Sequence, residues 1–210
     1  MPDKTPDLDA AYALQTPEDN RKLYADWAQT YDDSFARTMD YRLPQLVALV
    51  LSEVFQGPGP VLDVGAGTGL VAQHMLVPGL LEIDALDISA DMLAVAASKG
   101  LYRKTIEADL TQTLDIPDGT YGAVVSSGTF THGHVGPAAL DELLRVARKG
   151  AVFVLSINAE HFTARGFADK FAALEPVLEG LEHRIVDIYG AGADAAHRNV
   201  KAHIAVFTKR

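Results

Sequence analysis

The feature that most constrains the fold is a short apolar run followed by alternating glycines, in the stretch PVLDVGAGTGL at residues 60–70. The run Val61–Val64 has the length and composition of a strand that is buried on both faces of a parallel sheet. The glycines of Gly65–Gly69 predict a tight turn, because glycine accepts positive φ and leaves bare backbone beside a ligand. A helix is expected from about Leu70, and its free N–H groups would face that ligand. The stretch therefore predicts a ligand site in a βα unit.

Strand and helix patterns alternate along the rest of the chain. Further strands are expected at Glu82–Asp87, Leu101–Ile106, Tyr121–Ser126, Ala151–Ile157, Arg184–Tyr189 and His203–Thr208. Helices are expected after the Thr16-Pro17 cap, over Pro44–Phe55, from Ser89 to Lys99, after Gly136-Pro137 and over Phe167–Leu178, whereas Met1–Thr16 reads as a loose arm. Repeated βαβ units that end in a strand pair predict an α/β fold with a doubly wound, mostly parallel seven-stranded sheet and helices on both faces.

Length and composition narrow the class of protein. The 210 residues favour a single domain, with an arm and lid helix at residues 1–40 and an α/β core at residues 41–210. The net charge of −10 argues against a nucleic-acid partner, because an acidic surface repels phosphates. Cysteine is absent, which excludes thiol chemistry, and no apolar run is long enough for a membrane span. The polar start is unlike a signal peptide, so a cytoplasmic location is expected.

The spacing of the glycines separates two classes of cofactor. Dinucleotide-binding folds carry G-x-G-x-x-G, whereas this chain has G-x-G-x-G with Asp63 inside the preceding strand. The seven residues Asp63–Gly69 resemble motif I of the class I S-adenosylmethionine-dependent methyltransferases, (D/E)-x-G-x-G-x-G. The resemblance implies a Rossmann-like methyltransferase fold and S-adenosyl-L-methionine as cofactor. An NAD(P)-dependent oxidoreductase and a nucleoside-binding module without turnover stay open as alternatives.

Other positions match the order of the family's cofactor site. Asp87 lies about 20 residues past the turn, where the family has an acid that accepts hydrogen bonds from both ribose hydroxyls. An acid there is also expected in an NAD-binding fold, and Asp87 is alternatively a helix cap. By resemblance, Ile88 and Met92 flank the adenine, and Asp109 contacts its amino group. The expected cofactor-binding set is Tyr31, Asp63, Gly65, Ala66, Gly67, Gly69, Asp87, Ile88, Met92, Asp109, Leu110 and Ser126.

The loop at Gly128–Gly136 is the expected place of the substrate chemistry. Many N-methyltransferases of the family carry an N/D-P-P-Y motif after the fourth strand, and this chain has SSGTFTHGH instead. We predict that His132 and His134 are catalytic, because a neutral imidazole can take a proton from a hydroxyl, thiol or amine. A loop without chemical role is equally open. The pair lacks companion ligands, so no metal site is predicted. Asn158 and His161 are second-rank candidates at the same sheet edge.

The helix after Thr16 carries aromatic residues on one face, Tyr24, Trp27 and Tyr31. The stretch W-A-x-x-Y-D that begins at Trp27 resembles a helix that folds over the cofactor in small-molecule methyltransferases. Together with the His132 loop and Gly166-Phe167, it is similar to the methyltransferase-like proteins typified by the one encoded in the Williams–Beuren region. The segment is therefore expected to be an N-terminal helical lid, mobile without ligand, with Tyr31 near the methionine end of the cofactor. A fixed helix packed on the core is the alternative.

These observations together predict an S-adenosylmethionine-dependent methyltransferase acting on a small-molecule acceptor, with neither nucleic acid nor membrane as partner. A protein methyltransferase is the second choice within the enzymes.

Overall fold

The computed structural model describes residues 6–14, 16–75, 82–131 and 135–210. Within these residues one sheet has the strand order β3-β2-β1-β4-β5-β7-β6. The strands are β1 (Val61–Val64), β2 (Ile83–Asp87), β3 (Lys104–Glu107), β4 (Tyr121–Phe130), β5 (Ala147–Asn158), β6 (Leu178–Asp187) and β7 (Lys201–Lys209). The strands from β3 to β5 are parallel, and β7 is antiparallel to β5 and β6. The predicted doubly wound, mostly parallel seven-stranded fold is confirmed.

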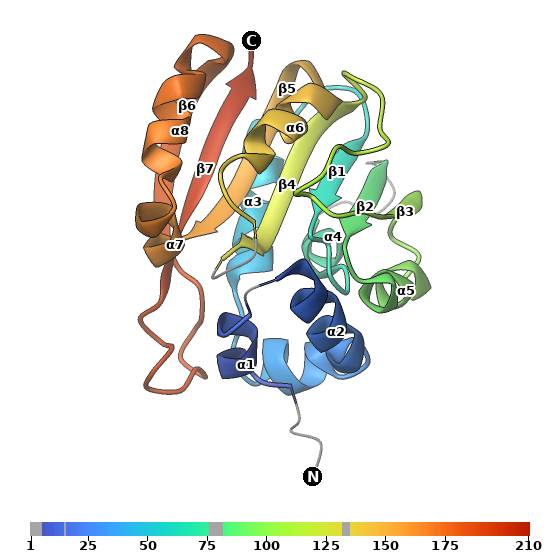
Figure 1. Cartoon of the computed structure of the whole chain (residues 1–210), viewed down its shortest axis with the longest axis vertical. Coiled ribbons are helices and arrows are strands. Elements are labelled where there is room, and N and C mark those ends of the chain that lie inside the picture. Colours follow the sequence, from blue (N-terminus) through green and yellow to red (C-terminus); the bar gives the residue numbers. More distant parts are fainter. Residues whose placement is uncertain (1–5, 15, 76–81, 132–134) are drawn as a thin grey trace.

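Helices cover both faces of this sheet (Figure 1). The first face carries α3 (Leu43–Val54), α4 (Leu70–His74) and α5 (Ala90–Ser98), and the second carries α6 (Ala139–Val146), α7 (Ala159–Ala164) and α8 (Phe167–Leu174). Alternate residues of β1 enter the two cores, Val61 on the α3 side and Leu62 on the α6 side. The central strand is thus apolar on both faces, as its sequence predicts.

The N-terminal segment, residues 16–41, contains α2 (Pro17–Trp27) and a π-helix (Asp32–Arg37). Figure 1 shows α2, with the preceding α1 (Leu8–Tyr12), below the arrowheads of β4 and β5. The start of α2 follows from its sequence, because Thr16 and Asp19 form a capping box and Pro17 occupies the first turn. Asp32 attaches the segment to the core, since its carboxylate accepts from Thr68 Oγ1 at 2.5 Å and from Lys99 Nζ at 2.6 Å.

Two expected boundaries are wrong for reasons of tertiary contact. The strand expected from Leu101 begins only at Lys104, because the Tyr102 hydroxyl donates to Asp63 beneath the glycine turn. The strand expected to end at Ser126 continues to Phe130 across a register shift in its pairing with β5. β4 therefore extends further along the edge where ligands bind in open α/β sheets.

Two expectations about helices also differ from the structure. The expected loose arm over Met1–Thr16 is wrong where α1 forms, since Asp7 Oδ1 accepts from Ala10 N at 2.8 Å. The helix expected to reach Leu178 ends at Leu174 and passes into a 3₁₀ turn (Glu175–Val177) that contains Pro176. Proline removes a backbone donor from a helix, and the chain then turns into the long edge strand β6.

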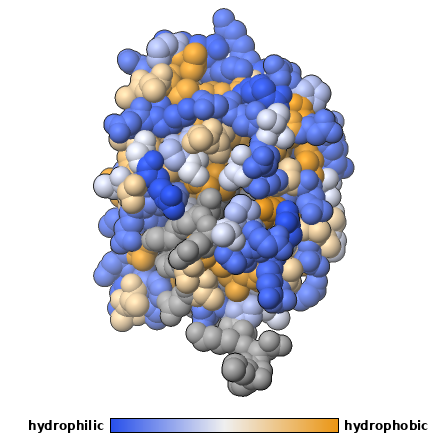
Figure 2. Space-filling view, viewed as in Figure 1, coloured by the Kyte–Doolittle hydropathy of each residue, from blue (hydrophilic) through white to orange (hydrophobic). Residues whose placement is uncertain are grey.

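The surface in Figure 2 is largely hydrophilic, with hydrophobic residues in smaller patches. None of the helices in the described ranges has the length and apolar character needed to cross a membrane.

Candidate functional site

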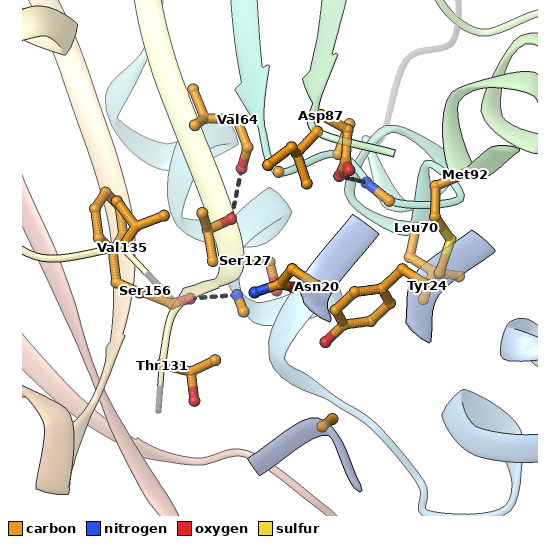
Figure 3. A pocket seen from close by; sticks show the side chains of 18 of the residues that line it. Asn20, Tyr24, Val64, Leu70, Asp87, Met92, Ser127, Thr131, Val135 and Ser156 are labelled. Atoms are coloured by element: carbon orange, nitrogen blue, oxygen red, sulfur yellow. Dashed lines mark hydrogen bonds between the residues drawn. The ribbon is translucent and has the colours of Figure 1, made fainter. Parts of the chain in front are cut away.

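A cavity of about 170 Å³ lies between the carboxyl ends of the parallel strands and the N-terminal segment. Its sheet side is lined by Gly65–Thr68, Asp87–Ile88, Ala108–Thr111, Ser127–Thr131, Ser156 and Asn158. Its other side is lined by Leu8, Ala11, Asn20, Tyr24, Trp27, Tyr31, Phe35, Tyr41, Ile188 and Tyr189, among others. Figure 3 shows Asn20 and Tyr24, from α2, facing Asp87 and Val64 across this space. Residues that are far apart in the sequence, from Leu8 to Tyr189, thus line one site.

The glycine turn after β1 is locked against β4. Gly65 has φ +64°, and a Cβ there would overlap Thr129 Oγ1. The hydroxyls of Ser126 and Thr129 lie 2.8 and 2.9 Å from the Val64 carbonyl oxygen. Gly67, at φ +54°, lines the cavity, and a Cβ there would meet no atom within 4 Å. The turn therefore presents bare backbone to a ligand, as glycine permits.

Asp87 joins this turn to the start of α5. Its carboxylate accepts from Gly67 N at 2.8 Å and from Ser89 N at 2.9 Å. Burial raises the pKa of Asp87, and these backbone donors partly oppose the shift. A carboxylate has about four acceptor positions, so two further hydrogen bonds from a ligand remain possible. That capacity suits the two hydroxyls of a ribose.

Asp63 lies outside the cavity lining. It is fully buried, its Oδ2 accepts from the Tyr102 hydroxyl at 2.7 Å, and its Oδ1 has no hydrogen-bond partner in the described part of the chain. Burial raises the pKa of Asp63 to about 7, although the Tyr102 hydrogen bond opposes this shift. Asp63 therefore acts on the turn through Tyr102, whose ring lies against Gly69.

The structure brings most of the expected cofactor residues together. The expected residues that line the cavity are Tyr31, Gly65, Ala66, Gly67, Asp87, Ile88, Met92, Asp109 and Leu110. Gly69 and Ser126, like Asp63, are not among the lining residues, since Gly69 begins α4 and the Ser126 hydroxyl is turned to Val64. The predicted catalytic pair His132 and His134 lies outside the described residues.

The two second-rank candidates differ in position. Asn158 lines the cavity, whereas His161 lies behind it. His161 Nε2 is 2.9 Å from the carbonyl oxygen of Val135, which itself lines the cavity, so this ring nitrogen donates. His161 thus holds the backbone at the edge of the site and offers no group to the cavity itself.

Several lining residues are absent from the sequence-based set. Phe35, Tyr41 and Tyr189 form an aromatic wall, with ring centroids 5.3 Å apart for Phe35–Tyr41 and 5.7 Å for Tyr41–Tyr189. Asn20 is a buried polar residue in α2, and a polar residue on a helix face that is otherwise buried is a signal available from sequence. Tyr189 gives no such signal, because only the fold pairs it with Tyr41.

The residues present fit the S-adenosyl-L-methionine that the motif implies. Asp87 offers oxygens for ribose hydroxyls, and Asp109 offers a carboxylate for an adenine amino group. Ile88, Met92 and Leu110 line the same region and provide apolar contact for an adenine ring. The open space above Gly67 admits a ligand against the backbone.

Comparison with known proteins gives one family. A sequence model of the family described as "Methyltransferase domain" matches residues 62–155. The human protein Methyltransferase-like protein 27 is 33% identical over 186 residues, which cover 87% of this chain and 74% of that protein. Malonyl-[acyl-carrier protein] O-methyltransferase of Pectobacterium atrosepticum is 32% identical over 100 residues, covering 48% of this chain and 39% of the relative.

Solved structures share the fold at low sequence identity. A candidate S-adenosyl-L-methionine-dependent methyltransferase of Methanococcus maripaludis superposes with a TM-score of 0.62 and 14% identity. The superposition covers 90% of this chain and 93% of the Methanococcus chain. A SAM-dependent methyltransferase of Aquifex aeolicus superposes with a TM-score of 0.55 and 19% identity, and the superposition covers 93% of this chain and 100% of the Aquifex chain. At these identities the likeness concerns the fold alone.

The buried Asp63 predicts a specific pH dependence of stability. Its pKa of about 7 in the folded protein lies above that of an unfolded aspartate, so the folded state binds the proton more tightly. The stability from this protonation is present below about pH 4 and is lost as the pH rises through 7. Raising the pH from about 5 to about 7.5 should lower the free energy of unfolding of both proteins. The decrease should be about 2 kcal/mol smaller for Asp63→Asn than for the unchanged protein.

Urea unfolding at several pH values measures this difference. The exposed variant Asp26→Asn serves as the control and should keep the pH profile of the unchanged protein. Parallel pH profiles for Asp63→Asn and the unchanged protein would contradict the assignment.

Proposed function

This chain belongs to the class I S-adenosyl-L-methionine-dependent methyltransferases, and we propose that it methylates a small-molecule acceptor. The observation that supports a small acceptor is the place of the cavity, between the strand ends and the N-terminal segment that lies across them. Trp27, which lines it from α2, is only 2% exposed, and the N-terminal segment lies across the strand ends from β1 to β5. A protein substrate would need an open groove in which an extended peptide could lie.

We assign the cofactor contacts to the sheet side of the cavity. Asp87 accepts the ribose hydroxyls, Asp109 accepts from the adenine amino group, and Ile88, Met92 and Leu110 flank the adenine. The turn Gly65–Gly67 lies against the cofactor with its bare backbone, and Tyr31 faces the methionine end. Burial raises the pKa of Tyr31 well above its usual range, so its hydroxyl stays protonated and can donate.

When bound, S-adenosyl-L-methionine supplies a methyl group on a sulfonium, which is an already activated donor. That methyl group would pass to a lone pair of the acceptor, and the electron pair of the broken C–S bond would remain on sulfur. The chain's part is to align the acceptor in line with this bond and to exclude water. In our proposal His132 or His134 takes the proton that the acceptor loses.

The N-terminal segment acts as a lid in this proposal. Its attachment near the turn consists of a few polar contacts, from Asp32 to Thr68 and Lys99 and from Arg21 Nε to the Ile88 carbonyl at 3.3 Å. Its rings pack on one another, with Trp27 and Tyr31 at 5.1 Å between centroids, and Trp27 and Phe35 also join the buried core on the α3 side. Segments that cover an active site commonly open to admit ligands. The segment opens without ligand and closes over the cofactor.

The cofactor assignment predicts the affinity for S-adenosylhomocysteine, the product form of the cofactor. Asp87→Ala removes the ribose acceptor and should weaken binding by about 10- to 100-fold, which corresponds to roughly 1.5–3 kcal/mol for hydrogen bonds to a charged group. Titration calorimetry measures this, and Asp91→Ala, an exposed acid in the first turn of α5, should bind normally. Unchanged affinity in Asp87→Ala, or NAD binding as tightly as S-adenosylhomocysteine, would overturn the assignment.

One assay tests both the small-molecule acceptor and the histidine base. Methyl-labelled S-adenosyl-L-methionine is incubated with the protein and a cell extract separated into small molecules and proteins, and label should enter the small-molecule fraction. The double change His132→Gln with His134→Gln should lower this transfer by about 10²- to 10⁴-fold, because a general base is lost. Its affinity for S-adenosylhomocysteine should stay unchanged, and the exposed variant His74→Gln should transfer normally.

Label that enters only the protein fraction would favour a protein methyltransferase. Normal transfer by the double variant would mean that positioning alone performs the chemistry.

A further inference from the structure

The cavity divides into two halves along the sheet. The cofactor half, as proposed above, lies over β1, β2 and β3 and contains both of the lining carboxylates, Asp87 and Asp109. The acceptor half lies over the ends of β4 and β5 and is bounded by the aromatic wall of Phe35, Tyr41 and Tyr189. The inference below concerns this acceptor half and rests on the proposed function.

Asn158 is the one polar side chain here with an unused buried donor in the described part of the chain. It is the last residue of β5 and caps α7, and its Oδ1 accepts from Glu160 N at 3.0 Å and from His161 N at 3.2 Å. Those backbone donors establish which end of the amide is oxygen. Nδ2 is then left without a hydrogen-bond partner in a residue that lines the cavity and is 4% exposed.

A buried amide donor without a partner costs free energy, so a native structure that keeps one calls for an explanation. Substitution by a small apolar residue would remove the cost but also the cap of α7. A ligand atom that accepts a hydrogen bond removes the cost and retains the cap. Asn158 Nδ2 itself has almost no accessible surface, and a ligand atom that approached it from the cavity would give it the partner that the described residues do not.

Neighbouring groups define what else this molecule meets. Ser156 lies two residues before Asn158 in β5 and also lines the cavity, and its Oγ accepts from Gly128 N at 3.0 Å (Figure 3). The Tyr41 hydroxyl is 3.5 Å from Ser127 Oγ, where β4 passes the glycine turn. The aromatic wall offers flat apolar surface beside these hydroxyls. A planar body with a polar edge matches this arrangement.

The charge of the lining restricts the molecule further. Among the described lining residues there is no lysine and no arginine, and both carboxylates belong to the cofactor half. An anionic group placed in the acceptor half would lose its hydration without gaining an opposite charge. Carboxylates and phosphates are therefore disfavoured as acceptors.

We propose that the methyl acceptor is a neutral molecule with a flat apolar body, whose oxygen accepts a hydrogen bond from Asn158 Nδ2. Its body packs against the aromatic wall, and its polar edge faces β4 and β5. The donor at Asn158 sets the orientation of the molecule relative to the methyl group.

Asn158→Asp tests the donor with little structural change. Aspartate keeps the oxygen that caps α7 but replaces the –NH₂ donor by a second oxygen. Three probes share one ring system: 2-acetylnaphthalene is neutral with a carbonyl, 2-naphthoate is an anion, and 2-naphthylmethylamine is a cation. Their affinities are measured by calorimetry at pH 8 on protein saturated with S-adenosylhomocysteine. Thr163→Ala, an exposed change in α7, is the control.

In the unchanged protein 2-acetylnaphthalene should bind about tenfold more tightly than 2-naphthoate, and Asn158→Asp should weaken it about tenfold, the effect of one lost hydrogen bond plus repulsion between oxygens. The same variant should bind 2-naphthylmethylamine more tightly than the unchanged protein does. A merely structural role of Asn158 would weaken all three probes alike.

Several outcomes would contradict the proposal. These are tighter binding of 2-naphthoate than of 2-acetylnaphthalene, equal effects of Asn158→Asp on all probes, or no probe bound to the saturated protein. The binding of S-adenosylhomocysteine is measured first and separately, so a protein that fails to bind it contradicts the proposed function instead. Thr163→Ala should reproduce the affinities of the unchanged protein.

Discussion

The absence of a side chain at Gly65 is the constraint on which the rest of the site depends. With a Cβ there, the turn after β1 would collide with Thr129. Without it, the Val64 carbonyl comes within hydrogen-bond distance of two hydroxyls of β4, so β1 and β4 end side by side at the cavity. Asp87 then ties Gly67 to the end of β2. In our proposal, the cofactor half and the acceptor half of the cavity meet at this turn.

The other side of the cavity depends on residues far from this turn in sequence. α2 and the π-helix lie across the strand ends, and Asp32 joins them to Thr68 within the glycine turn and to Lys99. In our proposal, the turn that faces the cofactor therefore also carries a contact that holds the N-terminal segment. In our account, a ligand that occupies the cavity supports the same segment from inside, and cofactor binding and closure are thereby coupled.

The sequence predicted those features whose causes are local. The N-cap at Thr16, the cap of α5 at Ser89 and the glycine turn each depend on residues within a few positions, and the structure has them where expected. The predicted start of β3 was wrong because Tyr102 donates a hydrogen bond to Asp63, 39 positions away, and so lies outside the strand. Within the site, Asp87 was found from its place after a strand, whereas Tyr189 enters only because the fold brings it to Tyr41.

The central claim is that the N-terminal segment completes the site by closing over a bound cofactor. Hydrogen exchange of the backbone amides across residues 16–40, with and without saturating S-adenosylhomocysteine, tests it most directly. The account predicts that the α2 and π-helix amides exchange at least about tenfold more slowly with the ligand, while amides of the distant pair β6 and β7 change little. Equal protection of the segment in both states would mean that it is a fixed part of the fold and would contradict the account.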